Sequence, residues 1–331
     1  MTDSYSKPLL QISIPTYNRT SSLGVLLNDL RSLSDLVNDG KLGISVFDNS
    51  DHEFVRANKE LVGSFGTYSH NYINIGFGGN VKRCLLESRG EFTWVVSDDD
   101  KLIISEIRNV LKKLSEIKEK VAGIAIPCAI PVQGTKQRLK VIGLKDRYGE
   151  TNSFYEIIDP CKLPFDYLGS FIIKTKLLDA NTLKSLSLTN CYFQSLAYCA
   201  TLNRLDEVYV HDQPAVIWVG AENIRWSIAS LLQSRNELIT AIVEKFGTRM
   251  NRDRLYIEVM RWGIFSKAGL YKMNHSFTNV LDVLIFSSKN FSTISHLYLL
   301  LYLLPSVLLK PLFVLIFGLK QILRQLRKFK F

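Results

Sequence analysis

Short apolar runs alternate with amphipathic stretches along the first 130 residues. The run LLQISI at 9–14 stops at Pro15, and Thr20 to Ser22 then offer caps for a helix whose leucines recur at helical spacing as far as Leu33. Further apolar runs predict strands at 42–47, 67–74, 91–97 and 123–130. The segments between some of these runs predict helices at 80–88 and 103–118. Strands that alternate with helices indicate an α/β protein with a parallel sheet covered on both faces.

Polar residues follow four of these predicted strands. They are residues 16–19, Asp48, the glycine-rich loop at 74–80 and residues 98–100. Right-handed crossovers bring the carboxyl ends of parallel strands to one edge, and ligands bind in the crevice outside it. We therefore expect these four groups to line a single crevice.

Three consecutive carboxylates, Asp98, Asp99 and Asp100, directly follow the apolar run EFTWVVS. Each ionised carboxylate disfavours ionisation of its neighbours. A divalent cation relieves this repulsion, and Mg²⁺ or Mn²⁺ prefers carboxylate oxygens while phosphates and waters complete the coordination. The alternative is a solvated acidic turn that caps the following helix.

Two other segments have a functional and a purely structural interpretation. Asp48 in VFDNSD could accept the N–H groups of a base or the hydroxyl of a ribose, or it could only stabilise an Asx turn. The loop NIGFGGN lacks the lysine of a P-loop and does not match the dinucleotide fingerprint. It is either a flexible turn into a helix or a close backbone approach to a ligand, with Lys82 and Arg83 near enough to meet phosphate.

The positive charge of the chain is concentrated at its C-terminus. The formal net charge is +10, but seven positive residues and no acidic residue follow Asp282, which leaves +3 for residues 1–282. A nearly neutral body argues against a nucleic-acid-binding protein. The five cysteines are odd in number and scattered, and the first residues lack a signal-peptide core, which indicates a reducing cytosol.

Residues 297–319 are almost continuously apolar, and 320–331 are basic and amphipathic. The apolar run just reaches the length of about 20 residues that a spanning helix needs, but Lys310, Pro305 and Pro311 interrupt it. We expect monotopic attachment to the cytoplasmic leaflet through an interfacial helix that is attracted to anionic lipid. The alternative is a helix that packs into a partner or into the core of this chain.

The remaining segments complete the expected organisation. Residues 131–215 belong to the second half of the first domain, with strand candidates at 171–175 and 215–219, and 223–285 has helical spacing. We expect a domain at 1–222, a helical C-terminal region at 223–293 and a membrane-associating tail at 294–331.

The segments ISIPTYNR, VFDNSD, NIGFGGN and GEFTWVVSDDDKL, in this order and spacing, resemble family 2 glycosyltransferases. The resemblance implies the GT-A fold, a Rossmann-like mixed sheet flanked by helices. It also implies a divalent cation, Mg²⁺ or Mn²⁺, held by Asp98, Asp99 and Asp100. The family usually has an aspartate where this chain has Ser97, so which two aspartates bind the metal stays open. By position, the resemblance assigns the nucleotide-sugar to Pro15, Thr16, Tyr17, Asn18, Arg19, Asp48, Asn74, Gly76, Asn80, Arg83, Asp98 and Asp99.

The resemblance is weaker beyond residue 160. The segments at 166–178 and 214–227 are similar to acceptor-side segments of bacterial O-antigen transferases such as abequosyltransferase. Many family members carry an acidic pair that provides the catalytic base, and TNCYFQSLAY at 189–198 lacks it. Asp166, Asp212 and Glu222 are the candidate bases, and His211 is assigned no role.

The predicted function is metal-dependent, inverting transfer of a sugar from a nucleotide-sugar to a lipid-linked or polysaccharide acceptor in the assembly of a bacterial surface polysaccharide. The enzyme would act at the cytoplasmic face of the inner membrane, with an anionic membrane surface as a partner and no nucleic acid. Two alternatives are a nucleotidyltransferase and a non-catalytic nucleotide-binding scaffold at a membrane surface.

Overall fold

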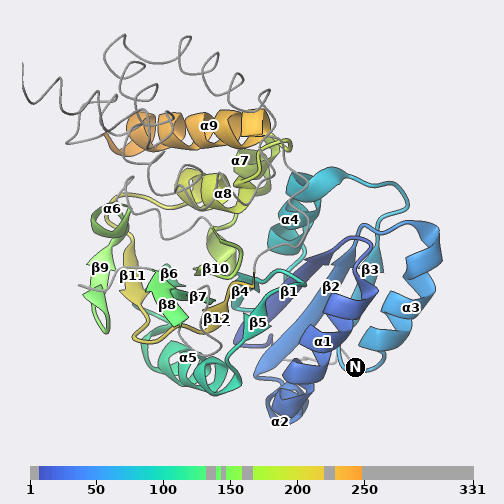
Figure 1. Cartoon of the computed structure of the whole chain (residues 1–331). Coiled ribbons are helices and arrows are strands. Elements are labelled where there is room, and N and C mark those ends of the chain that lie inside the picture. The colour runs from blue at the N-terminus through green and yellow to red at the C-terminus, as the bar shows by residue number, and fades with distance from the viewer. Residues whose placement is uncertain (1–6, 132–138, 143–146, 159–166, 220–227, 248–331) are drawn as a thin grey trace, which may run out of the picture. The chain divides into compact units, whose positions relative to one another are not determined.

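A large mixed sheet organises the protein (Figure 1). The computed structural model describes residues 7–131, 139–142, 147–158, 167–219 and 228–247. Eight strands of this described part form one sheet in the order β3-β2-β1-β4-β10-β6-β11-β9. Their bounds are β1 Leu10–Thr16, β2 Leu42–Asp48, β3 Thr67–His70, β4 Phe92–Val95, β6 Gly123–Ala125, β9 Thr151–Ser153, β10 Phe171–Lys174 and β11 Glu207–Val210.

The first four strands confirm the parallel prediction. β1 lies between β2 and β4, parallel to both, and β3 is parallel to β2. All seven residues of β1 are buried, as expected for a central strand covered on both faces. The sheet is mixed, as the family resemblance implies, because β10 runs antiparallel to both β4 and β6 and β9 runs antiparallel to β11. Apolar periodicity shows that a segment is buried but not in which direction it runs, so it could not reveal this reversal.

Helices cover both faces of the sheet and enclose two apolar cores. One core lies under α1, α2, α3 and α5, and the other lies under α4, α6, α7, α8 and α9. The bounds are α1 Thr20–Leu30, α2 Ser34–Asn38, α3 His52–Val62, α4 Gly76–Leu86, α5 Ile104–Ile117, α6 Phe154–Ile157, α7 Ala180–Lys184, α8 Phe193–Thr201 and α9 Ile228–Phe246, with 3₁₀ turns at Arg31–Leu33 and Thr175–Leu177. This arrangement confirms the predicted mixed sheet flanked by helices.

A second, four-stranded sheet has the order β5-β12-β7-β8. It consists of β5 Lys101–Leu102, β7 Cys128–Pro131, β8 Leu139–Ile142 and β12 Val216–Ile217. The apolar run at 123–130, predicted as one strand, is therefore two strands in two sheets, β6 and β7. The candidate at 215–219 is confirmed as β12, which joins the segment after the aspartates through β5.

The glycine-rich segment is not a loop throughout, because α4 begins at Gly76, four residues before the predicted start. Gly76 has a φ of +74°, a conformation that glycine adopts without a steric penalty. A Cβ atom on Gly78 would collide with the backbone carbonyl of Leu188. The glycines thus allow the first turn of α4 to approach a distant segment of chain.

This close approach gives a stability prediction. Gly78→Ala is expected to lower the free energy of unfolding by about 1–3 kcal/mol, because backbone must move to relieve the overlap. Gly24→Ala, inside α1, is the matched control: its Cβ would lie 3.6 Å from Leu61, an ordinary contact, and a helical Ala is favoured over Gly by about 1 kcal/mol. Denaturant unfolding of both variants should give shifts of opposite sign, and equal shifts would contradict the packing of α4.

The helix α9 belongs to the same unit as the sheet, Met1–Thr248. Its Leu238, Ile242 and Phe246 are buried in the second core, where the Phe246 ring lies 5.5 Å from that of Phe154. Within the described residues, α9 included, no helix is both long and apolar enough to cross a membrane. The predicted tail at 294–331 and most of the predicted helical region at 223–293 lie outside the described residues.

Candidate active site

The three aspartates lie where β4 leaves the sheet. The amide of Val96 still donates to the carbonyl of Ser13 on β1, at 3.1 Å, and the Asp100 amide donates to the Ser97 carbonyl at 3.3 Å to close a turn. Asp98 is 3% exposed and Asp100 is 7% exposed. Ser97 donates its hydroxyl hydrogen to Asp99. The turn therefore buries two carboxylates instead of presenting all three to solvent, which a simple helix-capping turn would not require.

The first loop supplies donors to this cluster, as the sequence predicts. Thr16, the last residue of β1, donates its hydroxyl to Asp98 Oδ2 at 2.6 Å. The Arg19 guanidinium donates to Asp98 Oδ1 at 3.0 Å and to Asp99 Oδ2 at 2.7 Å. Residues about 80 positions apart are thus joined at one edge of the sheet.

Burial and charge act against each other in this cluster. Burial raises the pKa of Asp98 to about 6, although the bonds from Thr16 and Arg19 offset part of the shift. Burial also raises the pKa of Asp100 well above its usual range, and the charges of Asp99 and Asp98 add to the shift. Burial alone would lower the pKa of Arg19, but Asp98 and Asp99 outweigh it and raise that pKa. Arg19 therefore stays charged and neutralises part of the cluster.

The surroundings of Asp100 suit a divalent cation that is bound by the protein and by a ligand together. The backbone N–H of Val219 bonds to its carboxylate, and the other nearby charges are mainly negative. Over the described ranges, no group of three or more Asp, Glu, His or Cys side chains is arranged to hold a metal ion by itself. Because Mg²⁺ typically takes only one or two protein carboxylates, two of the aspartates and a diphosphate would suffice.

The first loop is also fixed to the loop that follows β2. Asn18 has a φ of +54°, in the left-handed region. Its amide hydrogen bonds to Ser50 Oγ at 2.8 Å, and its side chain exchanges hydrogen bonds with Asp51, at 2.6 and 2.9 Å. Pro15 is buried within β1, and Tyr17 is half-buried. These contacts stabilise an unusual backbone conformation next to the aspartates.

Asp48 is fully buried at the carboxyl end of β2. Its carboxylate accepts hydrogen bonds from the Ser50 amide at 2.8 Å, the Asn58 side chain at 2.8 Å and the Tyr68 hydroxyl at 2.6 Å. In this structure Asp48 therefore fixes the loop at 49–51. Its direct contact with a base or ribose stays a prediction.

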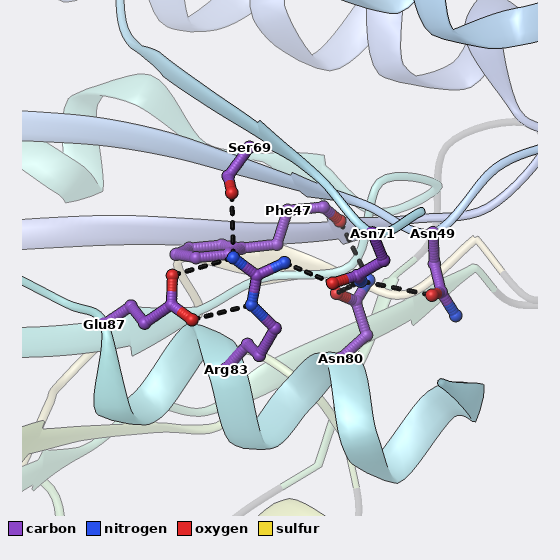
Figure 2. A network of polar contacts seen from close by, with 7 residues as sticks. All are labelled: Phe47, Asn49, Ser69, Asn71, Asn80, Arg83 and Glu87. Carbon is purple, nitrogen blue, oxygen red and sulfur yellow. Dashed lines mark hydrogen bonds and ion pairs between the residues drawn. The ribbon is translucent and has the colours of Figure 1, made fainter. Parts of the chain in front are cut away.

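A network of asparagine side chains joins the loops after β2 and β3 to α4 (Figure 2). Asn49 donates to Asn74 Oδ1 at 2.5 Å and accepts from the Asn71 side chain at 3.1 Å and from the Ile75 amide at 3.0 Å. Asn71 also donates to Asn80 Oδ1 at 3.1 Å, and Asn80 donates to the Phe47 carbonyl at 2.8 Å. The predicted residues Asn74, Gly76 and Asn80 are therefore brought together, and the network fixes the backbone around them.

Arg83 extends this network on the far side of Asn71. Its guanidinium donates to Asn71 Oδ1, to Ser69 Oγ at 2.8 Å and to both carboxylate oxygens of Glu87, at 2.7 and 2.8 Å (Figure 2). The guanidinium also lies over the Phe47 ring, 5.5 Å from its centroid. Arg83 is thus directed at β3 and α4, and its predicted contact with a donor phosphate stays a prediction.

Of the three candidate bases, only Asp212 lies within the described residues; Asp166 and Glu222 fall outside them. Asp212 follows β11 and accepts a long hydrogen bond, 3.4 Å, from the Tyr209 hydroxyl. It lines a groove of about 240 Å³ between α5 and the end of β11. His211 lines the same groove, with its Nε2 atom 3.2 Å from Glu106, and burial lowers its pKa. The contact with Glu106 joins the end of β11 to α5, which is a structural role.

Sequence reasoning missed Asn49, Asn71 and Asn58, which connect the predicted residues to one another. Asn49 directly follows Asp48, so the end of this strand was predicted to carry a functional carboxylate, but the side-chain amide of Asn49 was given no role. Asn71 follows β3, where an asparagine is an ordinary turn residue, and Asn58 lies inside α3, so neither residue gave a signal in a single sequence.

The family described as "Glycosyl transferase family 2" matches residues 11–180, more than half of the 331 residues. Comparison with curated proteins gave no match. Among solved structures, S. aureus TarS 1-349 in complex with UDP-GlcNAc has a TM-score of 0.58 and 15% identity, over 84% of this chain and 79% of that one. The same S. aureus protein in complex with UDP has a TM-score of 0.54 and 17% identity, over 84% and 78%. At this identity the likeness is one of fold.

Proposed function

The chain belongs to glycosyl transferase family 2 and is a glycosyltransferase with the GT-A fold, and from this premise we propose that it transfers a sugar, with inversion, from a nucleotide-sugar to a membrane-held glycan acceptor in bacterial surface-polysaccharide assembly. The observation that carries the proposal is the buried cluster of Asp98 and Asp100 with Asp99, bonded to Thr16 and Arg19 at the carboxyl edge of the sheet.

Each part of this edge has a role in the proposal. Thr16 and Arg19 position Asp98 and limit its repulsion with Asp99. The asparagine network holds the loops at 49–51 and 71–76 in place before a donor arrives, so that donor binding need not pay for ordering them. The related fold of S. aureus TarS is known with UDP-GlcNAc and with UDP, which is the donor chemistry proposed here.

We assign the cation to Asp100 together with one of Asp98 and Asp99, because both oxygens of Asp98 accept bonds from Thr16 and Arg19, and both oxygens of Asp99 accept bonds from Ser97 and Arg19. When bound, Mg²⁺ or Mn²⁺ would neutralise the diphosphate of the leaving nucleotide as a Lewis acid. A general base must take the proton of the acceptor hydroxyl, and Asp212 is the described candidate. Abequosyltransferase-like specificity is the corresponding proposal for the sugar.

The acceptor side of the proposal rests on the sequence. The apolar and basic residues at 294–331 fit an anionic membrane surface, so we place the enzyme at the cytoplasmic face of the inner membrane with a lipid-linked acceptor. No observation favours a nucleotidyltransferase or a non-catalytic scaffold.

The test is release of nucleoside diphosphate from a panel of nucleotide-sugars by the full chain, in Mn²⁺, in Mg²⁺ and in EDTA. We expect one donor to be turned over, and turnover to fall at least about 100-fold in EDTA, since several kcal/mol of charge stabilisation is removed. NMR of the product should show the inverted anomeric configuration. Turnover that is equal with and without metal would contradict the metal-dependent proposal, and retention would contradict inversion.

A further inference from the structure

Large apolar side chains that are exposed to solvent gather at the carboxyl edge of the sheet. Seven are exposed among the described residues. Five of them lie at this edge and are called the apolar rim below: Tyr72 at 99% exposure, Ile73 at 77%, Ile75 at 39%, Leu188 at 43% and Val219 at 57%. The other two lie elsewhere: Val25 is in the middle of α1, and Leu205 precedes β11 at the opposite edge.

Contacts place each rim residue at this edge. Tyr72, Ile73 and Ile75 belong to the loop between the end of β3 and the start of α4. The Leu188 carbonyl touches the first turn of α4 at Gly78. Val219 donates its backbone N–H to Asp100, within the aspartate cluster itself. The rim therefore borders the same edge as the candidate active site.

The rim loop is held rigidly although its side chains have few contacts of their own. Asn49 accepts from the Ile75 amide and donates to Asn74, and the Asn71 amide donates to the Asp48 carbonyl at 2.8 Å. The buried Asn49 and Asn71, together with the exposed Asn74, thus support a loop whose Tyr72 and Ile73 project into water. Exposed apolar groups that cluster at one place mark an interaction site. A loop that is already ordered loses less conformational entropy when it binds.

We propose that the apolar rim docks on the surface of an anionic lipid bilayer, with the active-site crevice facing the membrane. Isoleucine side chains and a tyrosine with an apolar ring and a polar tip suit the boundary between headgroups and acyl chains. The exposed Lys101 follows the aspartates and Lys82 lies on α4, so cations flank the rim and complement anionic headgroups. The basic and apolar composition of residues 294–331 points to the same kind of surface.

The inference rests on the proposed function, because a crevice that faces the bilayer can reach an acceptor that is anchored in the membrane. It adds a second contact with the membrane, made by the folded catalytic unit, and it defines which edge of that unit faces the lipid.

The experiment compares two double variants of the full chain on vesicles of phosphatidylglycerol and phosphatidylcholine. Tyr72→Ser with Ile73→Ser removes two rim side chains, and Val25→Ser with Leu205→Ser removes two exposed side chains elsewhere. We expect the rim variant to partition to vesicles roughly tenfold less than the wild type, and the control to partition like the wild type. Equal partitioning of all three proteins would overturn the proposal, as would equal losses in both variants.

A local probe guards against strong binding by the rest of the chain. Tyr72→Trp should give a blue-shifted emission on vesicles and quenching by brominated lipid, and Leu205→Trp should give neither. No quenching at position 72 would overturn the proposal. A change in oligomeric state without quenching would also overturn it and would identify a second copy of the chain as the partner.

Donor turnover in solution separates this proposal from the proposed function. The control double variant should release nucleoside diphosphate at the wild-type rate, because Val25 and Leu205 are exposed and lie away from the carboxyl edge of the sheet. If the wild type releases none from any donor, the proposed function fails, while quenching at Tyr72→Trp would still show docking without explaining its purpose.

Discussion

Asp100→Asn is expected to lower sugar transfer at least about 100-fold, while raising the thermal stability of the metal-free protein. The loss follows because a neutral amide is a poor ligand for Mg²⁺ or Mn²⁺, and the cation supplies several kcal/mol of charge stabilisation, with each 1.4 kcal/mol corresponding to tenfold in rate. The initial rate with Mn²⁺ at saturating donor is the measurement. Asp35→Asn is the matched control, because Asp35 pairs with Arg108 on the surface and should leave the rate unchanged.

The stability gain has a defined pH dependence. Burial and the neighbouring aspartates raise the pKa of Asp100 in the folded state above its unfolded value. Folding is therefore least penalised while Asp100 is protonated, and the wild type loses stability as pH rises from the unfolded pKa through the folded one. The asparagine can still accept from the Val219 amide but carries no charge, so its advantage in EDTA should grow over that rise. A variant that retains wild-type transfer, or one that is less stable than the wild type at neutral pH in EDTA, would refute this account.

Asn49→Ala is expected to raise the KM for the donor about tenfold or more and to lower the free energy of unfolding by about 1–3 kcal/mol. The Asn49 side chain bonds to Asn74, Asn71 and the Ile75 amide, and it is 4% exposed. Its removal takes one acceptor from the Asn71 side chain and the acceptor from the Ile75 amide, and it frees the loop at 71–76. Steady-state kinetics well below the melting temperature, together with denaturant unfolding, measure the two effects.

Asn49→Asp is the matched control for this network. A carboxylate can still accept from Asn71 and from the Ile75 amide but cannot donate to Asn74, so we expect a smaller rise in KM than for alanine. If Asn49→Ala binds the donor as the wild type does, the network has no part in preparing the donor site, and its role is restricted to stability.

The sequence predicted those parts of the fold that depend on local pattern. The apolar runs at 9–14, 42–47 and 91–97 are β1, β2 and β4, and their parallel order follows from the helices between them. The reversal of β10 and the division of 123–130 between two sheets depend on which strand lies alongside, and no short-range pattern records that. The early start of α4 was missed because glycine is usually read as a loop signal, whereas Gly78 is needed for contact with Leu188.

The candidate site was predictable in position but not in its connections. Thr16, Arg19 and the aspartates follow strands whose ends must meet, so their proximity could be argued from topology. The inward orientation of Asp48 could not, because it depends on Tyr68 and Asn58, two residues that carry no motif. Likewise, the ion pair between Arg83 and Glu87 arises from their spacing of four residues at the end of α4. In this pair Glu87 occupies the guanidinium that was predicted to bind a ligand.

The burial of α9 in the second core limits how this enzyme can be recombined with other chains. Leu238, Ile242 and Phe246 fill space beside Phe154, so a fragment cut at residue 180, where the family match ends, or at 222 would leave an open apolar face. A chimaera that exchanges the residues beyond α9 should therefore be joined after residue 247. The smallest fragment that keeps the second core intact therefore includes α9, which lies beyond the residues that match the family.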